Sequence, residues 1–410
     1  MTIIDLLLIS IDSLRLDHTG RATQSRVQTP RFDRICEGFA LSERCFSVSS
    51  ATRPVHTSLV TGLYPFEHGI QAQQDGRVRQ GAPRLFRQCS DHGFDVGLFS
   101  EAASIFTGLD LGAPVGSLAP DARTGLEQVS RWMRQGDRSG GRCLLLHYWS
   151  VHTPYGAADG MAQGETAALL RQGRVEEVRR RYVRAVENVF ENKVAPLLEA
   201  IDLSRWAVLL FGDHGESWTP DEFYHGTTVR NSVLRVPLYV HVPYSGNPQP
   251  GDGGVISLVD LYATVCGLLG MERLDDGFGI DLLAGGMESH GTGPHGIRMA
   301  EIRPGRDAGQ DWVDTRAEQV PDTRPKAPLR WCVFDERYRL HGENENWRLE
   351  TQWTELPLDT DAKLLAAPYV TARKAFREHS KWVQRPLGEG PMSSVEEDLL
   401  RRRLQALGYL

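Results

Sequence analysis

Two apolar runs that lie far apart in the chain each end just before an aspartate. Residues 3–9 precede Asp12, and residues 206–211 precede Asp213. Runs of this length and composition are typical of buried parallel strands. Parallel strands end at a common edge of the sheet, and in open α/β proteins that edge binds ligands. We therefore expect Asp12 and Asp213 to meet at a binding edge.

Strand-like and helix-like segments alternate along the chain, which predicts an α/β fold whose mainly parallel sheet is flanked by helices. A helix is expected over residues 175–200, where Pro196 should kink or shorten it, and another over 257–269, closed by Gly270. The predicted strands cover residues 2–10, 94–100, 142–148, 206–211 and 236–242.

Composition predicts three regions. Residues 1–285 should form the large α/β domain. Residues 286–327 are rich in Gly, Pro, Asp and Arg and read as a surface connection or insertion. Residues 328–410 should form a small C-terminal sheet-and-helix subdomain, with strand and turn over 330–349 and a last helix over 394–407.

The chain has 410 residues, of which 40% are hydrophobic and 24% charged, with a net charge of -7. This balance indicates a globular protein and argues against nucleic acid as a partner, since that binding depends on clustered Lys and Arg. The six cysteines lack metal-ligand spacing and are expected to be buried, reduced thiols. The N-terminus has no signal-peptide pattern and no membrane span, so we expect a cytoplasmic protein; homo-oligomerisation stays open.

The run Thr52-Arg53-Pro54-Val55-His56 opens a predicted helix that ends at Gly62. Thr52 would lie at the helix start, where unpaired N–H groups and the helix dipole favour an anion. Its hydroxyl could attack a bound phosphate or sulfate. In isolation, a threonine at this position is more often a helix cap than a nucleophile.

Two further motifs carry metal-binding or proton-transferring side chains. They are His152-Thr153-Pro154-Tyr155 and Asp213-His214-Gly215-Glu216, and His225 follows the second. Carboxylates and an imidazole suit a divalent cation, although an Asp-His pair can also form a plain turn. A lone histidine is more often structural than catalytic.

Together these motifs resemble the sulfatase branch of the alkaline phosphatase superfamily. The resemblance rests on Thr52 standing ten residues before Gly62 in the stretch 61–69, Thr-Gly-Leu-Tyr-Pro-Phe-Glu-His-Gly. Matches then follow in order at residues 152–155, 213–216, 225–226, 235–238, 257–261 and the terminal 407–410. The likeness runs from end to end and is weakest between residues 285 and 330.

The resemblance implies that Asp12, Asp213 and His214 bind the metal and that Thr52 is both nucleophile and metal contact. Such an ion can lower the pKa of a bound water from about 15.7 to about 7 and stabilise transition-state charge. His152 and His225 are expected to contact substrate oxygens and deliver a proton to the leaving group.

The chain departs from formylglycine sulfatases at the nucleophile. Those enzymes use Cys or Ser followed by x-Pro-x-Arg, whereas this chain has Thr52 first and His56 in place of the Arg. Thr52 therefore cannot mature to formylglycine by the usual route. Superfamily members with Ser or Thr nucleophiles hydrolyse phosphoryl groups, so the expectation moves from sulfate towards phosphate or phosphonate esters.

The metal ligands also depart from the common pattern. Ser13 stands where many sulfatases have another Asp, and His214 where they often have Asn. An imidazole moves the preference from calcium or magnesium towards manganese or zinc. We expect one divalent ion; a second is the less favoured alternative because no Asp lies near His152.

Three residues are expected to bind a small anionic ester substrate: Arg15, Arg53 and His56. The alternative for Arg15 or Arg53 is an ion pair with Asp17 or another carboxylate. The predicted function is metal-dependent ester hydrolysis through a covalent Thr52 intermediate. Transfer of the group to an alcohol, and a binding protein without activity, are the alternatives.

Overall fold

The computed structural model describes residues 4–135, 140–156, 163–219, 222–243, 254–284, 296–304, 327–354, 362–388 and 402. Its central feature is an eight-stranded sheet in the order β10-β2-β9-β6-β1-β5-β3-β4. The strands are β1 (Asp5–Ile11), β2 (Ala40–Phe46), β3 (Asp95–Ser100), β4 (Gly116–Ser117), β5 (Arg142–Tyr148), β6 (Trp206–Gly212), β9 (Arg235–His241) and β10 (Ile256–Ser257).

The middle of this sheet is parallel. Strand β1 pairs in parallel with β5 and β6, and β3 pairs in parallel with β5. Strand β9 runs antiparallel between β6 and β2. The predicted α/β class is confirmed, and all five predicted strands are present with shifts of a few residues at their ends.

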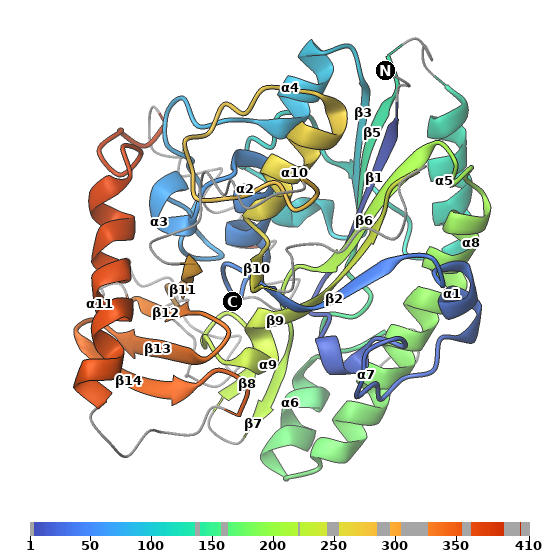
Figure 1. Cartoon of the computed structure of the whole chain (residues 1–410). Helices are drawn as coiled ribbons and strands as arrows, with labels where there is room; N and C mark the ends of the chain where they lie inside the picture. Colours follow the sequence, from blue (N-terminus) through green and yellow to red (C-terminus); the bar gives the residue numbers. More distant parts are fainter. Residues whose placement is uncertain are drawn as a thin grey trace.

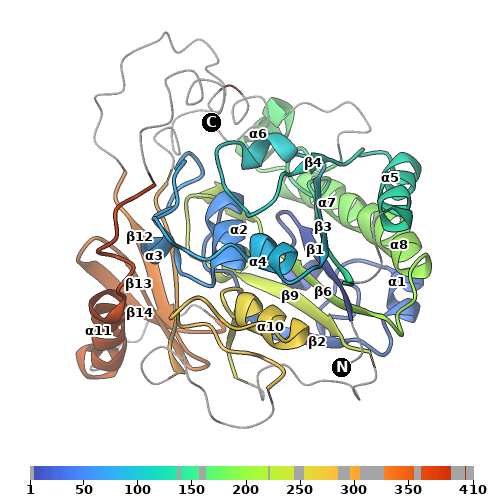
Figure 2. The ribbon, with the colours of Figure 1, turned by 90° about the horizontal axis from the view of Figure 1, so that it is seen from above.

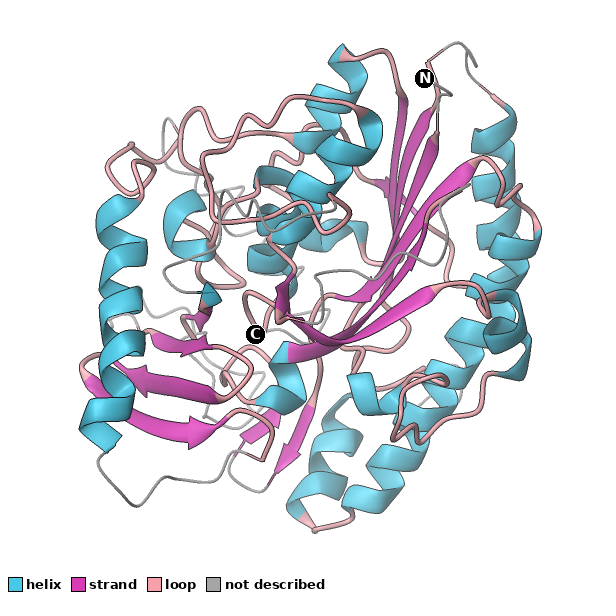
Figure 3. Cartoon of the chain, viewed as in Figure 1, coloured by secondary structure: helices cyan, strands magenta, loops and turns pink. Residues whose placement is uncertain are grey.

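Helices cover both faces of the sheet (Figures 1, 2 and 3). One face packs against α2 (Thr52–Thr61), α4 (Leu85–Asp91) and α10 (Asp260–Leu269). The opposite face packs against α1 (Pro30–Ile35), α5 (Ala122–Arg134), α7 (Val175–Val189) and α8 (Ala195–Glu199). The shorter helices are η1 (Leu16–His18), α3 (Pro65–His68), η2 (Ala103–Phe106), α6 (Gln163–Arg171) and α9 (Asn231–Leu234).

The predicted helix over residues 175–200 is present but contains a wide turn. A π-helix, Phe190–Val194, joins α7 to α8 directly before Pro196. Proline lacks an N–H and clashes with the preceding turn, and a wide turn at that point relieves the conflict. The helix thus continues through Pro196, and the π-helix contains the buried Lys193, whose Nζ donates to Glu101.

A separate four-stranded antiparallel sheet forms the C-terminal part (Figure 1). It is covered by α11 (Ala362–His379), a helix that the sequence analysis did not predict. Strand β11 comes from the stretch expected to be a surface connection, so part of residues 286–327 belongs to this sheet. The strands are β11 (Arg298–Ile302), β12 (Arg330–Phe334), β13 (Tyr338–Glu343) and β14 (Asn346–Thr351).

Several other expectations can be compared with the structure. The helix ending at Gly270 is confirmed, since Gly270 adopts φ 65° after α10. All six cysteines are buried and free. Within the described ranges, no helix has the length and hydropathy needed to span a membrane. The predicted helix over 394–407 lies outside the described residues.

Candidate active site

The polar side chains of the site continue the apolar stripes of three neighbouring strands. Successive strand residues face opposite sides, so alternate residues of β1, β5 and β6 point towards α2. Leucine, cysteine and phenylalanine occupy these positions within the core. Asp12, His147 and Asp213 occupy the equivalent positions at the carboxyl ends of the three strands. All three side chains are buried. The predicted meeting of Asp12 and Asp213 at this edge is therefore what the fold produces.

Thr52 begins the buried helix α2 directly above this edge. Its Oγ donates to Asp12 Oδ2 over 3.1 Å and lies 3.4 Å from His214 Nε2. Pro54 occupies the first turn, and Gly62 ends the helix at φ 70° in the left-handed conformation. The predicted helix is thus present with both of its expected terminal residues.

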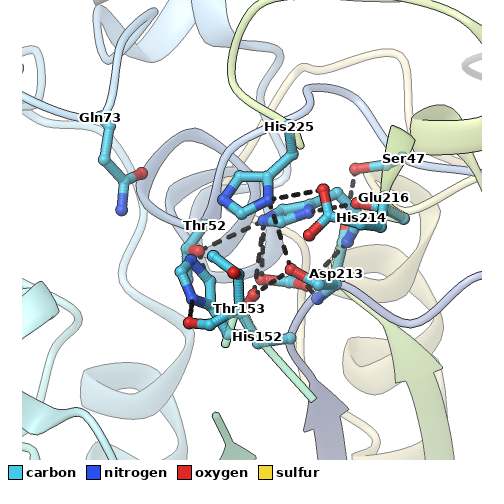
Figure 4. A network of polar contacts seen from close by, with 12 residues as sticks. Ser47, Thr52, Gln73, His152, Thr153, Asp213, His214, Glu216 and His225 are labelled. Carbon is cyan, nitrogen blue, oxygen red and sulfur yellow. Dashed lines mark hydrogen bonds and ion pairs between the residues drawn. The ribbon is translucent and has the colours of Figure 1, made fainter. Parts of the chain in front are cut away.

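Asp213 and His214 lie on the loop that follows β6, close to Thr52 and His225 (Figure 4). Asp213 Oδ1 accepts from the backbone N–H of Ser13 at 3.1 Å and of His214 at 2.7 Å. Asp213 Oδ2 is buried with no hydrogen-bond partner in the described part of the chain. His214 Nδ1 donates to the carbonyl of Gly215, so Nε2 keeps its lone pair and faces Asp12 Oδ1 and Asp213 Oδ2, both at 3.7 Å.

A divalent cation fits this arrangement. Ligand atoms of Asp12, Asp213 and His214 lie within 4.8 Å of one another, and all three residues are buried. Two buried carboxylates need a positive partner, because an unpaired buried charge is costly. The unpartnered Asp213 Oδ2 and the unprotonated His214 Nε2 are the donors that such an ion requires.

The pKa values of the Asp12 and Asp213 carboxyl groups are shifted in opposite directions. Burial alone would raise the pKa of Asp12, but contact with His147 and the nearby His152 and His214 hold that pKa well below its usual value. Burial and the negative charge of Asp12 raise the pKa of Asp213. A shared cation would remove this repulsion and leave both groups ionised.

His225 and His152 lie beside the candidate metal ligands Asp12, Asp213 and His214. Ring centroids lie 4.4 Å apart for His214 and His225, and 4.8 Å apart for His152 and His225. His225 Nδ1 contacts Glu216 Oε1 at 3.2 Å, and Tyr155 donates to Glu216 Oε2 at 3.0 Å. Glu216 thus supports His225, as expected for a residue behind the site.

Burial sets the protonation of these side chains. It lowers the pKa of His152 to about 4 and of His225 to about 3, and it raises the pKa of Glu216 to about 7. Both imidazoles are therefore neutral at neutral pH. His152 Nδ1 donates to the carbonyl of Thr153 at 2.8 Å, which leaves Nε2 of the neutral ring as an acceptor.

Comparison with known proteins identifies the family. The sequence model of the Sulfatase family matches residues 5–271, about two thirds of the chain. The chain belongs to the sulfatase family. No curated protein matches the sequence.

Solved structures share the sulfatase-family fold. A 2-O GAG sulfatase has 13% identity and a TM-score of 0.70, with 95% of each chain covered. The phosphonate monoester hydrolase of Agrobacterium radiobacter has 17% identity and a TM-score of 0.64, covering 92% of this chain and 96% of its own. The lipoteichoic acid synthase LtaP from Listeria monocytogenes has 15% identity and a TM-score of 0.60, with 94% of each chain covered.

Two arginines of this sulfatase-family chain were expected to bind substrate, and the structure engages both with protein groups. Arg15 donates to Asp17 through Nε and Nη2, both at 2.8 Å, which is the alternative pairing named above. Arg53 is fully buried and donates to the carbonyls of Asp75, Ile105 and Thr107. Burial lowers the pKa of Arg53 to about 9.

His56 lies in α2 close to Thr52, the residue that the resemblance gives as the nucleophile. Its Nδ1 donates to the carbonyl of Thr52 at 2.9 Å, one helical turn back along α2. The same nitrogen lies 4.0 Å from Asp213 Oδ2. Burial lowers the pKa of His56 to about 3, so this ring is also neutral. A role in holding the first turn of α2 accounts for these contacts.

Sequence reasoning missed two residues of the site. His147 Nε2 lies 3.4 Å from Asp12 Oδ2. Gln73 accepts the backbone N–H of Arg53 through Oε1, and its buried Nε2 has no hydrogen-bond partner in the described part of the chain (Figure 4). The alternation of the predicted strand 142–148 could have placed His147, but no local pattern marks Gln73.

Proposed function

We propose that the protein hydrolyses a phosphate or phosphonate ester, with sulfate esters as the third candidate class, through a covalent intermediate on Thr52. One observation carries the proposal. The Thr52 hydroxyl lies at the start of a buried helix and within 3.4 Å of both an acidic and an imidazole metal-ligand candidate. Asp12, Asp213, His214 and Thr52 would hold one divalent cation.

The bound cation would supply positive charge that favours the Thr52 alkoxide and polarises a substrate oxygen. The Thr52 hydroxyl would release its proton to solvent, and its oxygen would form a bond to phosphorus as the bond to the leaving oxygen breaks. The two N–H groups of the Gln73 amide, buried and without a hydrogen-bond partner in the described part of the chain, are available to donate to the non-bridging oxygens. These donors take the role that the occupied Arg15 and Arg53 guanidinium groups do not fill.

The two neutral imidazoles suit different proton transfers. His225 backed by a protonated Glu216 can give a proton to the leaving oxygen from one ring nitrogen while receiving one from Glu216 at the other. His152, whose Nε2 is an acceptor, can take a proton from the water that attacks the intermediate. Water then releases the group from Thr52 and restores its hydroxyl.

The test compares Thr52→Ala and Thr52→Ser with the wild type on aryl phosphate monoesters, diesters, phosphonates and sulfates, each with Mn²⁺, Zn²⁺, Mg²⁺ or Ca²⁺. We expect Thr52→Ala to lose roughly 10⁴-fold or more in kcat, as nucleophile removal does elsewhere, and Thr52→Ser to retain part of it. Thr57→Ala is the matched control, because the Thr57 hydroxyl donates to Arg53 O inside the same helix. Equal turnover by Thr52→Ala and wild type would refute the nucleophile.

Group transfer is the second candidate, favoured by the shared fold with a lipoteichoic acid synthase. The intermediate would then pass to an alcohol instead of water. Adding alcohols to the same assay separates the two outcomes, because transfer product in excess of free phosphate identifies a transferase. Absence of metal binding and turnover, with Thr52→Ala unchanged, would identify a binding protein.

A further inference from the structure

His147 approaches the metal-binding group through the oxygen that Thr52 also contacts. His147 Nε2 lies 3.4 Å from Asp12 Oδ2, which accepts the Thr52 hydroxyl at 3.1 Å. The imidazole is buried, and its Nε2 has no hydrogen-bond partner in the described part of the chain. His147 also falls within 4.8 Å of Asp213 and His56 in a second group of ligand atoms. His147 thus belongs either to a separate metal site or to the first one.

In a separate site formed by His56, His147 and Asp213, the His56 nitrogen nearest the carboxylate could not bind the ion. His56 Nδ1 faces the carbonyl of Thr52 at 2.9 Å, and a carbonyl only accepts, so this nitrogen carries the proton. The same Nδ1 is the atom 4.0 Å from Asp213 Oδ2. A protonated nitrogen has no lone pair in the ring plane to give to a metal. The His56 nitrogen nearest Asp213 therefore serves α2, whereas His147 Nε2 directly faces Asp12, a candidate ligand of the first site.

His147 is held as metal-binding histidines usually are. Its Nδ1 lies 2.8 Å from Ser100 Oγ, which also accepts the backbone N–H of Ala102 at 2.9 Å. A hydroxyl oxygen can accept both bonds, and the Nδ1–H tautomer leaves Nε2 bare. His214 has the same arrangement through Gly215 O. Both rings are thus anchored by Nδ1 and direct Nε2 at the carboxylate of Asp12.

The spacings fit adjacent positions around one ion. Ligands about 2.1 Å from a metal are about 3.0 Å apart at a right angle and about 3.4 Å apart in a tetrahedron. The contacts of Asp12 Oδ2 with Thr52 and His147 measure 3.1 and 3.4 Å, and Thr52 Oγ lies 3.4 Å from His214 Nε2. Ser13 Oγ donates to Asp12 Oδ1 at 2.8 Å, so it supports a ligand in this arrangement.

We propose that His147 Nε2 is a ligand of the same divalent ion that Asp12, Asp213 and His214 bind, an inference that rests on the proposed metal site. The donor set then holds two carboxylates, two neutral imidazoles and the Thr52 oxygen. Two nitrogen donors favour Mn²⁺, Zn²⁺ or another first-row transition ion over Ca²⁺ and Mg²⁺, which prefer oxygen.

The experiment counts nitrogen ligands on Mn²⁺-loaded protein by electron spin echo envelope modulation. We expect two directly bound nitrogens in the wild type, one in His147→Gln and one in His214→Asn. His56→Gln is the matched control and should keep two, because His56 is not a ligand. In a competition titration, His147→Gln should bind Mn²⁺ at least roughly tenfold more weakly.

The inference is overturned if the wild type shows one bound nitrogen and His147→Gln binds Mn²⁺ as tightly as the wild type. The proposed function still stands in that case if the protein binds the metal and turns over the ester. If the wild type binds no Mn²⁺ and hydrolyses no ester, the proposed function fails as well. If His147→Gln does not fold, Ser100→Ala replaces it in both measurements. It should keep two nitrogens and weaken Mn²⁺ binding severalfold, and wild-type affinity in that variant counts against the inference.

Discussion

A buried ion pair positions the loop that carries His152. Glu101 Oε2 accepts the backbone N–H groups of Trp149 and Ser150, both at 2.8 Å, and Glu101 Oε1 pairs with Lys193. Lys193 Nζ also donates to Ser150 Oγ at 2.7 Å. The exposed fractions of the Lys193 and Glu101 side chains are 5% and 2%. We predict that Glu101→Gln destabilises the fold and misplaces the His152 loop.

The magnitude follows from these contacts. Removing one partner of a buried ion pair costs about 3–5 kcal/mol, because the other charge stays buried and uncompensated. Hydrogen bonds to a charged group contribute about 1.5–3 kcal/mol each, and the neutral amide weakens those of Glu101. We expect Glu101→Gln and Lys193→Met each to cost about 3–5 kcal/mol, and the double variant to cost about 0.5–3 kcal/mol less than their sum.

Urea unfolding of the four proteins gives the coupling free energy. Glu177→Gln is the control, because the Arg174–Glu177 pair is exposed and its loss should leave the unfolding free energy almost unchanged. His152 sits two residues after Ser150, so kcat/KM of Glu101→Gln should fall roughly 10- to 100-fold. If each single variant lost less than about 1 kcal/mol of unfolding free energy and the double variant lost their sum, the pair would not hold the loop.

Two further predictions concern pH and metal. Burial raises the pKa of Glu67 to about 7, so the folded protein holds an extra proton between the unfolded pKa and pH 7, and stability falls as pH rises through that window. Glu67→Gln should remove up to about 3 kcal/mol of that loss, measured as the difference in unfolding free energy between pH 5 and pH 8. An unchanged difference contradicts this assignment. Chelation should lower the melting temperature, since an ion at about 100 times its Kd adds about 2.7 kcal/mol, and Asp213→Asn should abolish this dependence.

The sequence was sufficient for five of the eight strands of the large sheet, and three of these, β1, β5 and β6, are buried along their whole length. Continuous apolar runs such as residues 206–211 are typical of buried parallel strands, and their order predicted the α/β class. Helix α11 was missed because Pro368 lies inside it and several large apolar side chains remain exposed. Tertiary packing on the small sheet, not local pattern, decides that helix.

The site was predictable where a motif fixes both residue and register. Asp12, Thr52, Asp213 and His214 lie together, as their shared motif pattern implied. The guanidinium partners of Arg53 were not predictable, because they are backbone carbonyls of a loop far along the chain. Gln73 escaped for the same reason, since only the folded loop brings its amide to α2.

Two departures from the sulfatase pattern offset each other in charge. The resemblance places a carboxylate at position 13 and a guanidinium at position 56, and this chain has Ser13 and His56 instead. Burial lowers the pKa of His56 to about 3, so both replacements are neutral at physiological pH. Losing one negative and one positive charge leaves the net charge of the buried group unchanged. Thr52, the proposed nucleophile, therefore lies in a site that retains its net charge towards a divalent ion and an anionic substrate, although fewer charged groups provide it.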